Sequence, residues 1–227
     1  MITIKENSIF IADSHYNNER EILFTMLSKI QNKEIETSQI FLMGDMFDFL
    51  SEEIEYFKTI NHKVISLINR LSVDKEIIYL EGNHDFNLSN IFPNLEIITR
   101  ENQPLNIVQD SKNISISHGD IFTPIGYEIY TKIIRNHYVM KFLNLIDFNN
   151  WLSKKIEQDL KKKNICHKQK DFDNFIAKRV DNYNTDLVIE GHFHQGYIDE
   201  KYINLPSLCC DKRYMVYLNG KFEFNSL

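Results

Sequence analysis

The sequence lacks the features of repetitive, linker-rich and membrane-spanning proteins. Its 7 glycines and 4 prolines do not gather into a linker, and no internal repeat is present. No apolar run reaches the roughly 18 residues that a membrane-spanning helix requires. The first residues, MITIKENSIF, show no basic start followed by a long apolar segment. We therefore expect a cytoplasmic protein with one domain, or one domain with a large insertion.

Cysteine is scarce as well, because the chain has only Cys166, Cys209 and Cys210. An odd number of cysteines, in a chain too long to need covalent cross-links, does not indicate a disulfide framework. Adjacent cysteines also rarely pair with each other. We expect all three to be reduced thiols.

Basic side chains do not dominate the chain, whose formal net charge is -6. This balance argues against a nucleic-acid partner, whose binding face would be basic, and no obligate protein partner is evident. The charge is unevenly distributed: residues 121–180 hold 12 Lys and Arg against 6 Asp and Glu, and the remainder holds 14 against 26. That basic segment is also strongly apolar and has no strand pattern. It is predicted to be a helical insertion.

Five short, apolar, β-branched runs each end in a polar cluster. They are SIFIADSH, QIFLMGD, EIIYLEGNHD, NISISHGD and DLVIEGHFH. Such runs predict buried strands, and apolar residues at helical spacing predict helices over 22–30 and 54–71. Ligands of open α/β sheets bind outside the carboxyl ends of the strands, where all five clusters would lie. Later runs, KYINLPSL, RYMVYLNG and KFEFN, predict a terminal hairpin and a second sheet, so the fold class is α/β.

The five clusters contain side chains that bind divalent metals. They are Asp13-x-His15, Gly44-Asp45-x-x-Asp48, Gly82-Asn83-His84-Asp85, His118-Gly119-Asp120 and Gly191-His192-x-His194. Imidazole and carboxylate suit Mn, Fe, Zn or Ni, and the absence of cysteine argues against a structural zinc site. Seven ligands are too many for one tetrahedral ion but suit two ions that share a carboxylate. Such a pair of ions promotes phosphoester hydrolysis.

In this order, the five motifs resemble the calcineurin-like, or purple-acid-phosphatase-like, metallophosphoesterases over essentially the whole chain. The resemblance implies a metallophosphoesterase β-sandwich flanked by helices (α-β-β-α), with a helical cap inserted before the last motif strand. Residues 1–122 and 183–227 would form the core and residues 123–182 the cap. The resemblance also implies two divalent ions, with Mn²⁺ expected and Fe or Zn as alternatives. Their ligands would be Asp13, His15 and His194 for one ion and Asn83, His118 and His192 for the other, with Asp45 bridging.

The same resemblance gives three further residues catalytic roles. His84 would act as the general acid and Asp85 would orient it. Asp48 would contact a metal ligand without binding the metal itself. The alternative, purely structural interpretations are that His84 is a turn residue and that Asp48 and Asp120 cap helices. The histidines outside the motifs, which are His62, His137 and His167, are interpreted as surface residues.

The helical insertion gives the information about which phosphoester is the substrate. Its layout resembles the UDP-2,3-diacylglucosamine hydrolases of lipid A biosynthesis, as do the GN-x-DF-x-L frame at 82–88 and the pair Gly126-Tyr127. That resemblance implies a lipid-linked nucleotide sugar as substrate, cleaved at its pyrophosphate, and at most peripheral contact with the cytoplasmic face of the inner membrane. Its substrate-binding residues would include Tyr127, Lys162, Phe142 and Trp151.

One residue departs from that group, because its best-known branch has Arg where this chain has His84. Several alternatives therefore stay open. The enzyme could be a cyclic-nucleotide phosphodiesterase or general phosphatase, or less plausibly a nuclease, and the fold could also serve as a non-catalytic scaffold. Likewise, the apolar stripe of the insert could be the insert's own core, with the lysines forming a solvated face.

Overall fold

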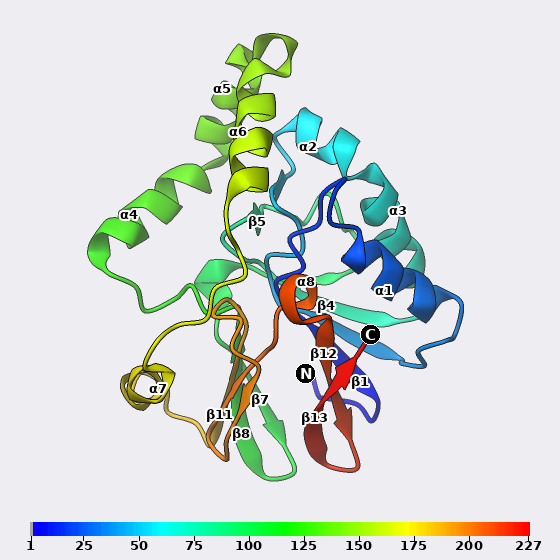
Figure 1. Cartoon of the computed structure of the whole chain (residues 1–227), viewed down its shortest axis with the longest axis vertical. Coiled ribbons are helices and arrows are strands. Elements are labelled where there is room, and N and C mark those ends of the chain that lie inside the picture. The colour runs from blue at the N-terminus through cyan, green and yellow to red at the C-terminus, as the bar shows by residue number, and fades with distance from the viewer. Residues whose placement is uncertain (1) are drawn as a thin grey trace.

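Two β-sheets pack face to face in the computed structural model, which describes residues 2–227 (Figure 1). The six-stranded sheet has the order β13-β12-β1-β2-β4-β6. Its strands are β1 (Ser8–Ile11), β2 (Gln39–Leu42), β4 (Glu76–Leu80), β6 (Glu96–Ile98), β12 (Arg213–Leu218) and β13 (Lys221–Ser226). The first four are parallel. The predicted terminal hairpin is confirmed as β12 and β13, joined at Asn219 and Gly220, which both have positive φ.

The five-stranded sheet has the order β10-β11-β9-β8-β7. Its strands are β7 (Leu105–Gln109), β8 (Lys112–Ser117), β9 (Leu187–Glu190), β10 (Tyr197–Ile198) and β11 (Tyr202–Asn204). Two short strands, β3 (Leu50–Ser51) and β5 (Asp85–Phe86), pair separately. The five strands predicted from the motifs are β1, β2, β4, β8 and β9, so the first sheet supplies three of them and the second sheet two.

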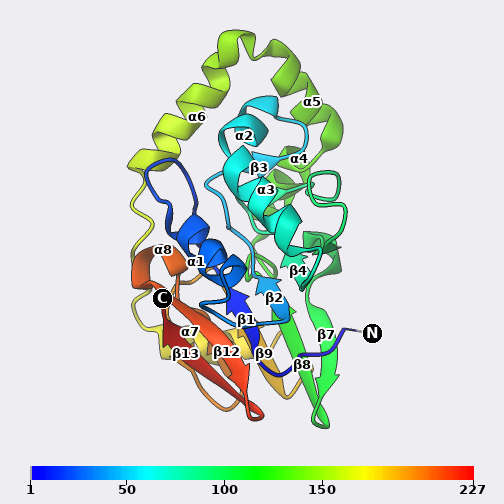
Figure 2. The same cartoon turned by 90° about the vertical axis from the view of Figure 1, so that its right-hand side faces the viewer.

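Helices cover the outer face of the six-stranded sheet. They are α1 (Ile22–Gln31) and α3 (His62–Leu71), which Figure 2 shows in front of this sheet. The short helix α2 (Glu55–Ile60) precedes α3 and packs its Phe57 against Phe86 and Met140 instead. The helix predicted over 54–71 is interrupted at Asn61. The side chain of Asn61 is buried and donates a hydrogen bond to the carbonyl of Phe49 (3.1 Å), so it anchors the break to the preceding loop.

The insert contains four α-helices, α4 (Ile125–Ile134), α5 (His137–Ile146), α6 (Trp151–Lys162) and α7 (Phe172–Val180), and the short η2 (Phe148–Asn150). Helices α4 to α6 stand away from the sandwich (Figure 1). Apolar contact with the core comes from a cluster in which Met140 packs with Phe57 and Phe86, and polar contacts include the hydrogen bond from the Tyr56 hydroxyl to Glu157. Helix α7 instead packs on the five-stranded sheet, where Ile176 contacts Val188 and Tyr202. The part of the predicted cap that projects from the core is therefore α4 to α6.

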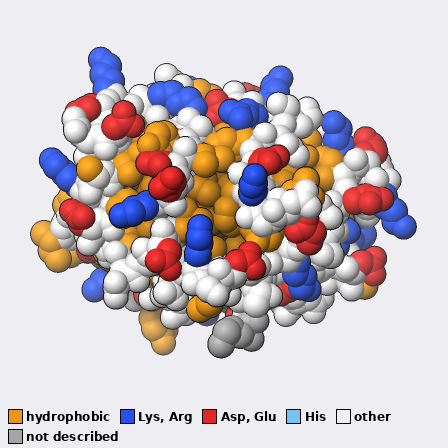
Figure 3. All heavy atoms as spheres, turned by 90° about the horizontal axis from the view of Figure 1, so that it is seen from below, with side chains coloured by type: hydrophobic (Ala, Val, Ile, Leu, Met, Phe, Trp, Pro, Cys, Tyr) orange, Lys and Arg blue, Asp and Glu red, His pale blue; other side chains and the backbone are white. Residues whose placement is uncertain are grey.

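The remaining short helices are η1 (Arg100–Asn102) and α8 (Leu208–Asp211). At the end of the sandwich opposite the cap, apolar side chains gather at the surface inside a charged rim (Figure 3). A cavity of about 310 Å³ opens there, with Ile114, Leu187 and Phe222 in its lining. Since Ile114 and Leu187 lie early in β8 and β9, this end is the amino side of the motif strands. Within residues 2–227, no helix combines the length and the apolar character needed to cross a bilayer.

Candidate metal centre

The seven predicted metal ligands meet at the carboxyl ends of the motif strands. Asp13 and His15 follow β1, Asp45 follows β2, Asn83 follows β4, His118 follows β8, and His192 and His194 follow β9. Ligand atoms of Asp13, His15 and His194 all lie within 4.8 Å of one another, and so do those of Asp45, His118 and His192. Asp45 also forms such a group with His15 and His84. It therefore lies between the two groups, in the position that a bridging ligand needs.

The second group converges on one nitrogen of His118. Nδ1 of His118 donates to the carbonyl of Met43 (2.8 Å), so in the neutral imidazole Nε2 carries a lone pair. This Nε2 lies 3.2 Å from Asn83 Oδ1, 3.2 Å from His192 Nδ1 and 3.6 Å from Asp45 Oδ1. A cluster of lone pairs at such distances is satisfied by a cation, and this donor set suits first-row divalent metals.

The first group leaves buried polar atoms without partners. His194 donates from Nδ1 to the carbonyl of Ile165 (2.9 Å) and points Nε2 at Asp13 Oδ1, 3.2 Å away. Within residues 2–227, neither Asp13 Oδ1 nor His15 Nδ1 has a hydrogen-bond partner, although both atoms are buried. Burial disfavours the charged form of Asp13, but His194, His118 and His15 outweigh it and lower the pKa of its carboxyl. These residues fit a metal ion.

The backbone is strained where the ligands lie. Five ligands have φ between 43° and 64°, in the left-handed region that residues other than glycine rarely adopt. They are Asp13, His15, Asp45, His192 and His194. Such strain persists only where the surrounding structure enforces it, and it clusters at functional sites.

A family comparison agrees with this geometry. A family model described as calcineurin-like phosphoesterase matches residues 7–196, a range that includes all seven ligands. The chain is a calcineurin-like phosphoesterase. As a member of this family it is a metal-dependent hydrolase. The two groups of side chains are its candidate metal ligands, and divalent ions, when bound, would supply Lewis-acid chemistry at a phosphoryl group.

Relatives of this phosphoesterase carry a more specific name. A UDP-2,3-diacylglucosamine hydrolase from Coxiella burnetii (strain RSA 493 / Nine Mile phase I) is 24% identical over 207 residues, covering 87% of this chain and 84% of the relative. One from Wigglesworthia glossinidia brevipalpis is 23% identical over 201 residues, covering 83% and 79%. Among solved structures, the Pseudomonas putida nuclease MPE aligns with a TM-score of 0.46 and 13% identity, covering 96% of this chain and 87% of the nuclease.

His84 lies beside the metal ligands of the phosphoesterase. Its ring donates from Nδ1 to the carbonyl of Asp48 (2.6 Å), which leaves Nε2 free in the neutral ring. Its backbone N–H donates to Asp45 Oδ1 (2.8 Å). The ring also contacts that of His15 edge-on, with centroids 5.1 Å apart. The carbonyl of Asp48 thus orients the ring.

The predicted role of Asp85 as the orienter of His84 is wrong. Asp85 is fully buried, and both of its oxygens accept hydrogen bonds from other groups. The donors are the backbone N–H groups of Asp45 (2.9 Å), Met46 (2.6 Å), Phe47 (3.3 Å) and Gly82 (3.0 Å) and the hydroxyl of Tyr79 (2.6 Å). Asp85 therefore fastens the loop of Asp45 to the turn that precedes Asn83. It shapes the metal centre through the backbone.

Asp48 and Asp120 bind arginine side chains rather than capping helices. Asp48 pairs with Arg20, accepts from Asn17 Nδ2 (2.5 Å) and lies 3.8 Å from His15 Nδ1, which is the position behind a ligand that the sequence predicts. Asp120 is buried and accepts from Arg100 Nε (3.1 Å).

A cavity of about 260 Å³ lies over the metal ligands. Its opposite wall is the segment that links α6 to α7, represented by Lys163, Asn164, Ile165, His167 and Gln169. His167 is exposed, as expected, but it also lines the cavity, because the linker folds back over the motifs. No local pattern in the sequence indicates this contact. His62 is exposed as expected, and His137 is exposed but pairs with Glu53.

The expectation of three reduced thiols is also wrong. Cys166 and Cys210 form a disulfide, with Cα atoms 5.5 Å apart, and Cys209 remains a free thiol. The pairing arises because the linker crosses α8. Nearby, Lys168 Nζ forms an ion pair with Asp211 (3.1 Å). These two links and the hydrogen bond from His194 to the carbonyl of Ile165 hold the wall of the cavity against the core.

We expect the binding of Mn²⁺ to the second group of ligands to release about one proton near neutral pH. Burial alone would lower the pKa of the His118 imidazole, but the carboxylates of Asp45, Asp120 and Asp13 have the larger effect. The net result is a pKa raised to about 9. Burial and His118 lower the pKa of His192 to about 3, so His192 is already neutral. The ion must displace the proton of His118, and the apparent affinity should therefore rise with pH up to about 9.

Calorimetry in buffers with different enthalpies of ionisation measures this proton release. His62→Asn, at the surface, is the control and should leave the number of protons unchanged. An affinity that does not vary with pH across the neutral range would contradict the prediction.

Proposed function

We propose that this phosphoesterase hydrolyses the pyrophosphate bond of UDP-2,3-diacylglucosamine and releases UMP and 2,3-diacylglucosamine 1-phosphate. The observation that carries the proposal is a basic cap with exposed apolar side chains beside a two-group metal centre. A small phosphate ester requires no such surface, whereas a lipid-linked nucleotide sugar carries both acyl chains and phosphates. The relatives named UDP-2,3-diacylglucosamine hydrolase support the same substrate.

Exposed apolar side chains of the cap support a role in binding acyl chains. Phe142 on α5 is 59% exposed and Trp151 at the start of α6 is 67% exposed. Met140 is instead buried, and Leu143 packs in the same cluster. The idea that the stripe is simply the core of the cap therefore does not account for Phe142 and Trp151. Apolar area of this kind is stabilised when it is covered by lipid.

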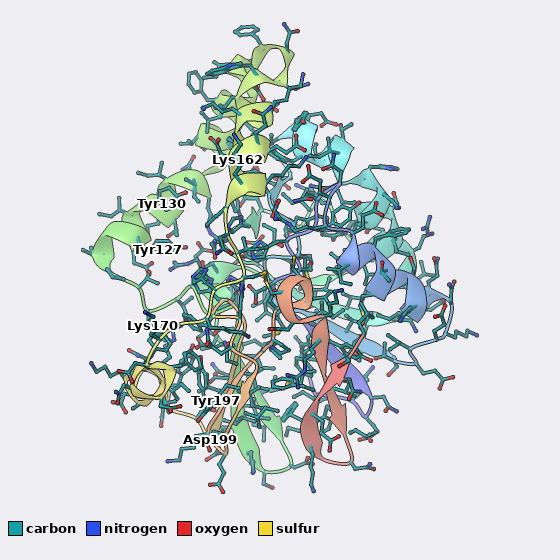
Figure 4. All side chains as sticks on the ribbon, in the orientation of Figure 1. Tyr127, Tyr130, Lys162, Lys170, Tyr197 and Asp199 are labelled. Atoms are coloured by element: carbon teal, nitrogen blue, oxygen red, sulfur yellow. A yellow bond between two sulfur atoms is a disulfide. The ribbon has the colours of Figure 1, made fainter. Side chains whose placement is uncertain are left out.

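We propose that polar groups of the cap bind the phosphates. Tyr127 on α4 and Lys162 at the end of α6 come from different cap helices (Figure 4). Burial, Asp120 and Asp45 raise the pKa of Tyr127, so its hydroxyl stays protonated and can donate to a phosphate oxygen. Lys163, next to Lys162, lines the cavity over the metal centre.

For the reaction itself, we propose Mn²⁺ at both metal sites and His84 as the acid. The Nε2 atom of His84 is free to hold a proton for the leaving oxygen, because Nδ1 is used by the carbonyl of Asp48. Asp48 supports His15 from behind the metal ligands. The imidazole, carboxylate and amide ligands suit Mn²⁺, and Fe or Zn would also accept them.

The far end of the cap supports peripheral contact with the cytoplasmic face of the inner membrane. Tyr138, Leu145 and Phe148 are among the most exposed apolar residues there, between 74% and 84%. Lys141 on α5 and Lys154 and Lys155 on α6 are also exposed. Apolar side chains next to cations favour an anionic lipid surface.

A thin-layer assay with UDP-2,3-diacylglucosamine and Mn²⁺ tests the function. We expect the lipid to be converted to UMP and the diacylated sugar phosphate. Parallel reactions contain bis(p-nitrophenyl) phosphate, a cyclic nucleotide and single-stranded DNA. If any of these is hydrolysed while the lipid is left intact, the substrate assignment is wrong and the corresponding alternative holds.

Substitutions in the cap should affect the lipid selectively. Phe142→Ala and Trp151→Ala should each lower kcat/KM for the lipid by about tenfold or more, because each removes about 1.5 to 3 kcal/mol of apolar contact. Turnover of bis(p-nitrophenyl) phosphate should be unchanged. The matched control is Val108→Ala, another exposed apolar side chain, which lies on β7 of the core. Equal losses on both substrates would mean that the two aromatic side chains only stabilise the cap.

A further inference from the structure

Two buried arginines of the insert bind groups next to metal ligands. Arg135, directly after α4, donates from Nη1 to Glu81 Oε2 (3.0 Å) and from Nη2 to the carbonyl of Gly82 (2.5 Å). Arg179, in α7, donates from Nη2 to the carbonyl of Gly119 (2.8 Å). The two arginines are 8% and 6% exposed. Both ends of the insert therefore enter the core at the motif loops.

Arg179 also forms a fork with Glu190. Its Nε lies 3.0 Å from Glu190 Oε2 and its Nη2 lies 2.8 Å from Oε1. Glu190 is fully buried and also accepts from the hydroxyls of Ser117 (3.0 Å) and Tyr202 (2.7 Å). A buried carboxylate with this many donors holds one position, because removal of a donor leaves a charge that is costly to bury.

The groups that these arginines bind share one property. Gly82 directly precedes Asn83, Gly119 directly follows His118, and Glu190 lies two residues before His192. Those three ligands and Asp45 form the second group, in which Asn83, His192 and Asp45 surround Nε2 of His118. The hydrogen bonds from the two guanidinium groups thus fix the backbone next to the second group of ligands.

We propose that Arg135 and Arg179 are positioning residues that set the affinity of the second metal site. An arginine fork fixes the direction of a carbonyl or carboxylate, whereas a lysine ammonium bonds as a point charge without that geometry. Partners behind metal ligands typically contribute 10- to 100-fold to metal affinity. The proposal concerns metal binding alone, so it does not depend on which phosphoester is cleaved.

The test is a titration of metal-free protein with Mn²⁺, followed by electron paramagnetic resonance. The variants are Arg135→Lys and Arg179→Lys, which keep the buried charge. The control is Tyr56→Phe, which removes a hydrogen bond of 2.5 Å between Tyr56 on α2 and Glu157 on α6. It therefore weakens the contact between cap and core away from the loops that carry the ligands.

Wild type and the Tyr56→Phe control should bind two ions per chain and show the signal of a spin-coupled pair. The lysine variants should keep one ion and bind the second about 10- to 100-fold more weakly, so that the coupled signal is lost at the same Mn²⁺ concentration. The proposal is wrong if wild type binds a single ion, or if variants with native circular dichroism bind both ions as wild type does.

A measurement on the wild-type chain covers the case in which a variant fails to fold. Because coupling between two sites is reciprocal, Mn²⁺ should also slow hydrogen exchange of backbone amides at residues 133–137 and 177–181. Residues 151–160 of α6 are the internal comparison and should change less. If Mn²⁺ protects the motif loops but neither arginine segment, the arginines are not coupled to the metal site.

Discussion

Asp45→Asn is expected to lower kcat for bis(p-nitrophenyl) phosphate by more than about 100-fold, a larger loss than removal of a partner behind a ligand causes. The carboxylate of Asp45 lies close to predicted ligands of both metal groups, which are His15 in the first group and His118 and His192 in the second. Asparagine keeps the oxygen that accepts from the N–H of His84 (2.8 Å), so the fold should be retained. What is lost is the negative charge between two cations.

Metal content per chain and turnover should be measured on the same preparations. Asp74→Asn, at the surface, is the control for the loss of a carboxylate and should behave as wild type. If Asp45→Asn binds two ions and hydrolyses the substrate at the rate of wild type, the shared-ligand assignment fails. If wild type with bound metal shows no turnover on any phosphoester, the site is not catalytic under these conditions and the scaffold alternative gains support.

Gly82→Ala should have a comparable effect, although residue 82 has no side chain to contribute. A Cβ atom at Gly82 would lie 2.3 Å from Asp45 Oδ1 and 2.4 Å from the backbone nitrogen of Asp45. Both distances are far below van der Waals contact, and the backbone nitrogen has no freedom to move aside. We expect Asp45 to be displaced, with loss of bound Mn²⁺, a loss of activity of about tenfold or more, and destabilisation of about 1 to 3 kcal/mol.

The matched control is Gly126→Ala in α4, where an added Cβ meets no atom within 4 Å. Alanine is the better helix former by about 0.5 to 1 kcal/mol, so this variant should be as stable as wild type or more so. Thermal unfolding and a Mn²⁺ titration compare the two. Equal behaviour of the two alanine variants would show that the turn at residue 82 can relax.

The sequence was sufficient to predict the strands and the convergence of the candidate metal ligands, because both depend on local patterns. A buried strand reads as a short apolar run, and a side chain directly after it must lie at the edge of the sheet. That is why Asn83, directly after the turn at Gly82, could be grouped with His118, which lies far away in the chain. The fold class followed from the same runs together with the family resemblance.

Contacts between distant segments were not predictable in this way. Cys166 and Cys210 are 44 residues apart, and nothing near either one indicates that the linker crosses α8. The place of His167 in the wall of the cavity depends on the same crossing. The role of Asp85 as the orienter of His84 came from the family resemblance. The actual donors to Asp85 are mostly backbone N–H groups, which leave no trace in a sequence.

The disulfide also closes a covalent ring around one part of the metal centre. The ring runs from Cys166 to Cys210, and it contains α7 with Arg179 and the loop after β9 with His192 and His194. A protease that cuts once inside this ring leaves a nicked protein whose two fragments stay joined until a reductant separates them. Two of the seven metal ligands are therefore carried on a stretch of chain that is covalently secured at both ends.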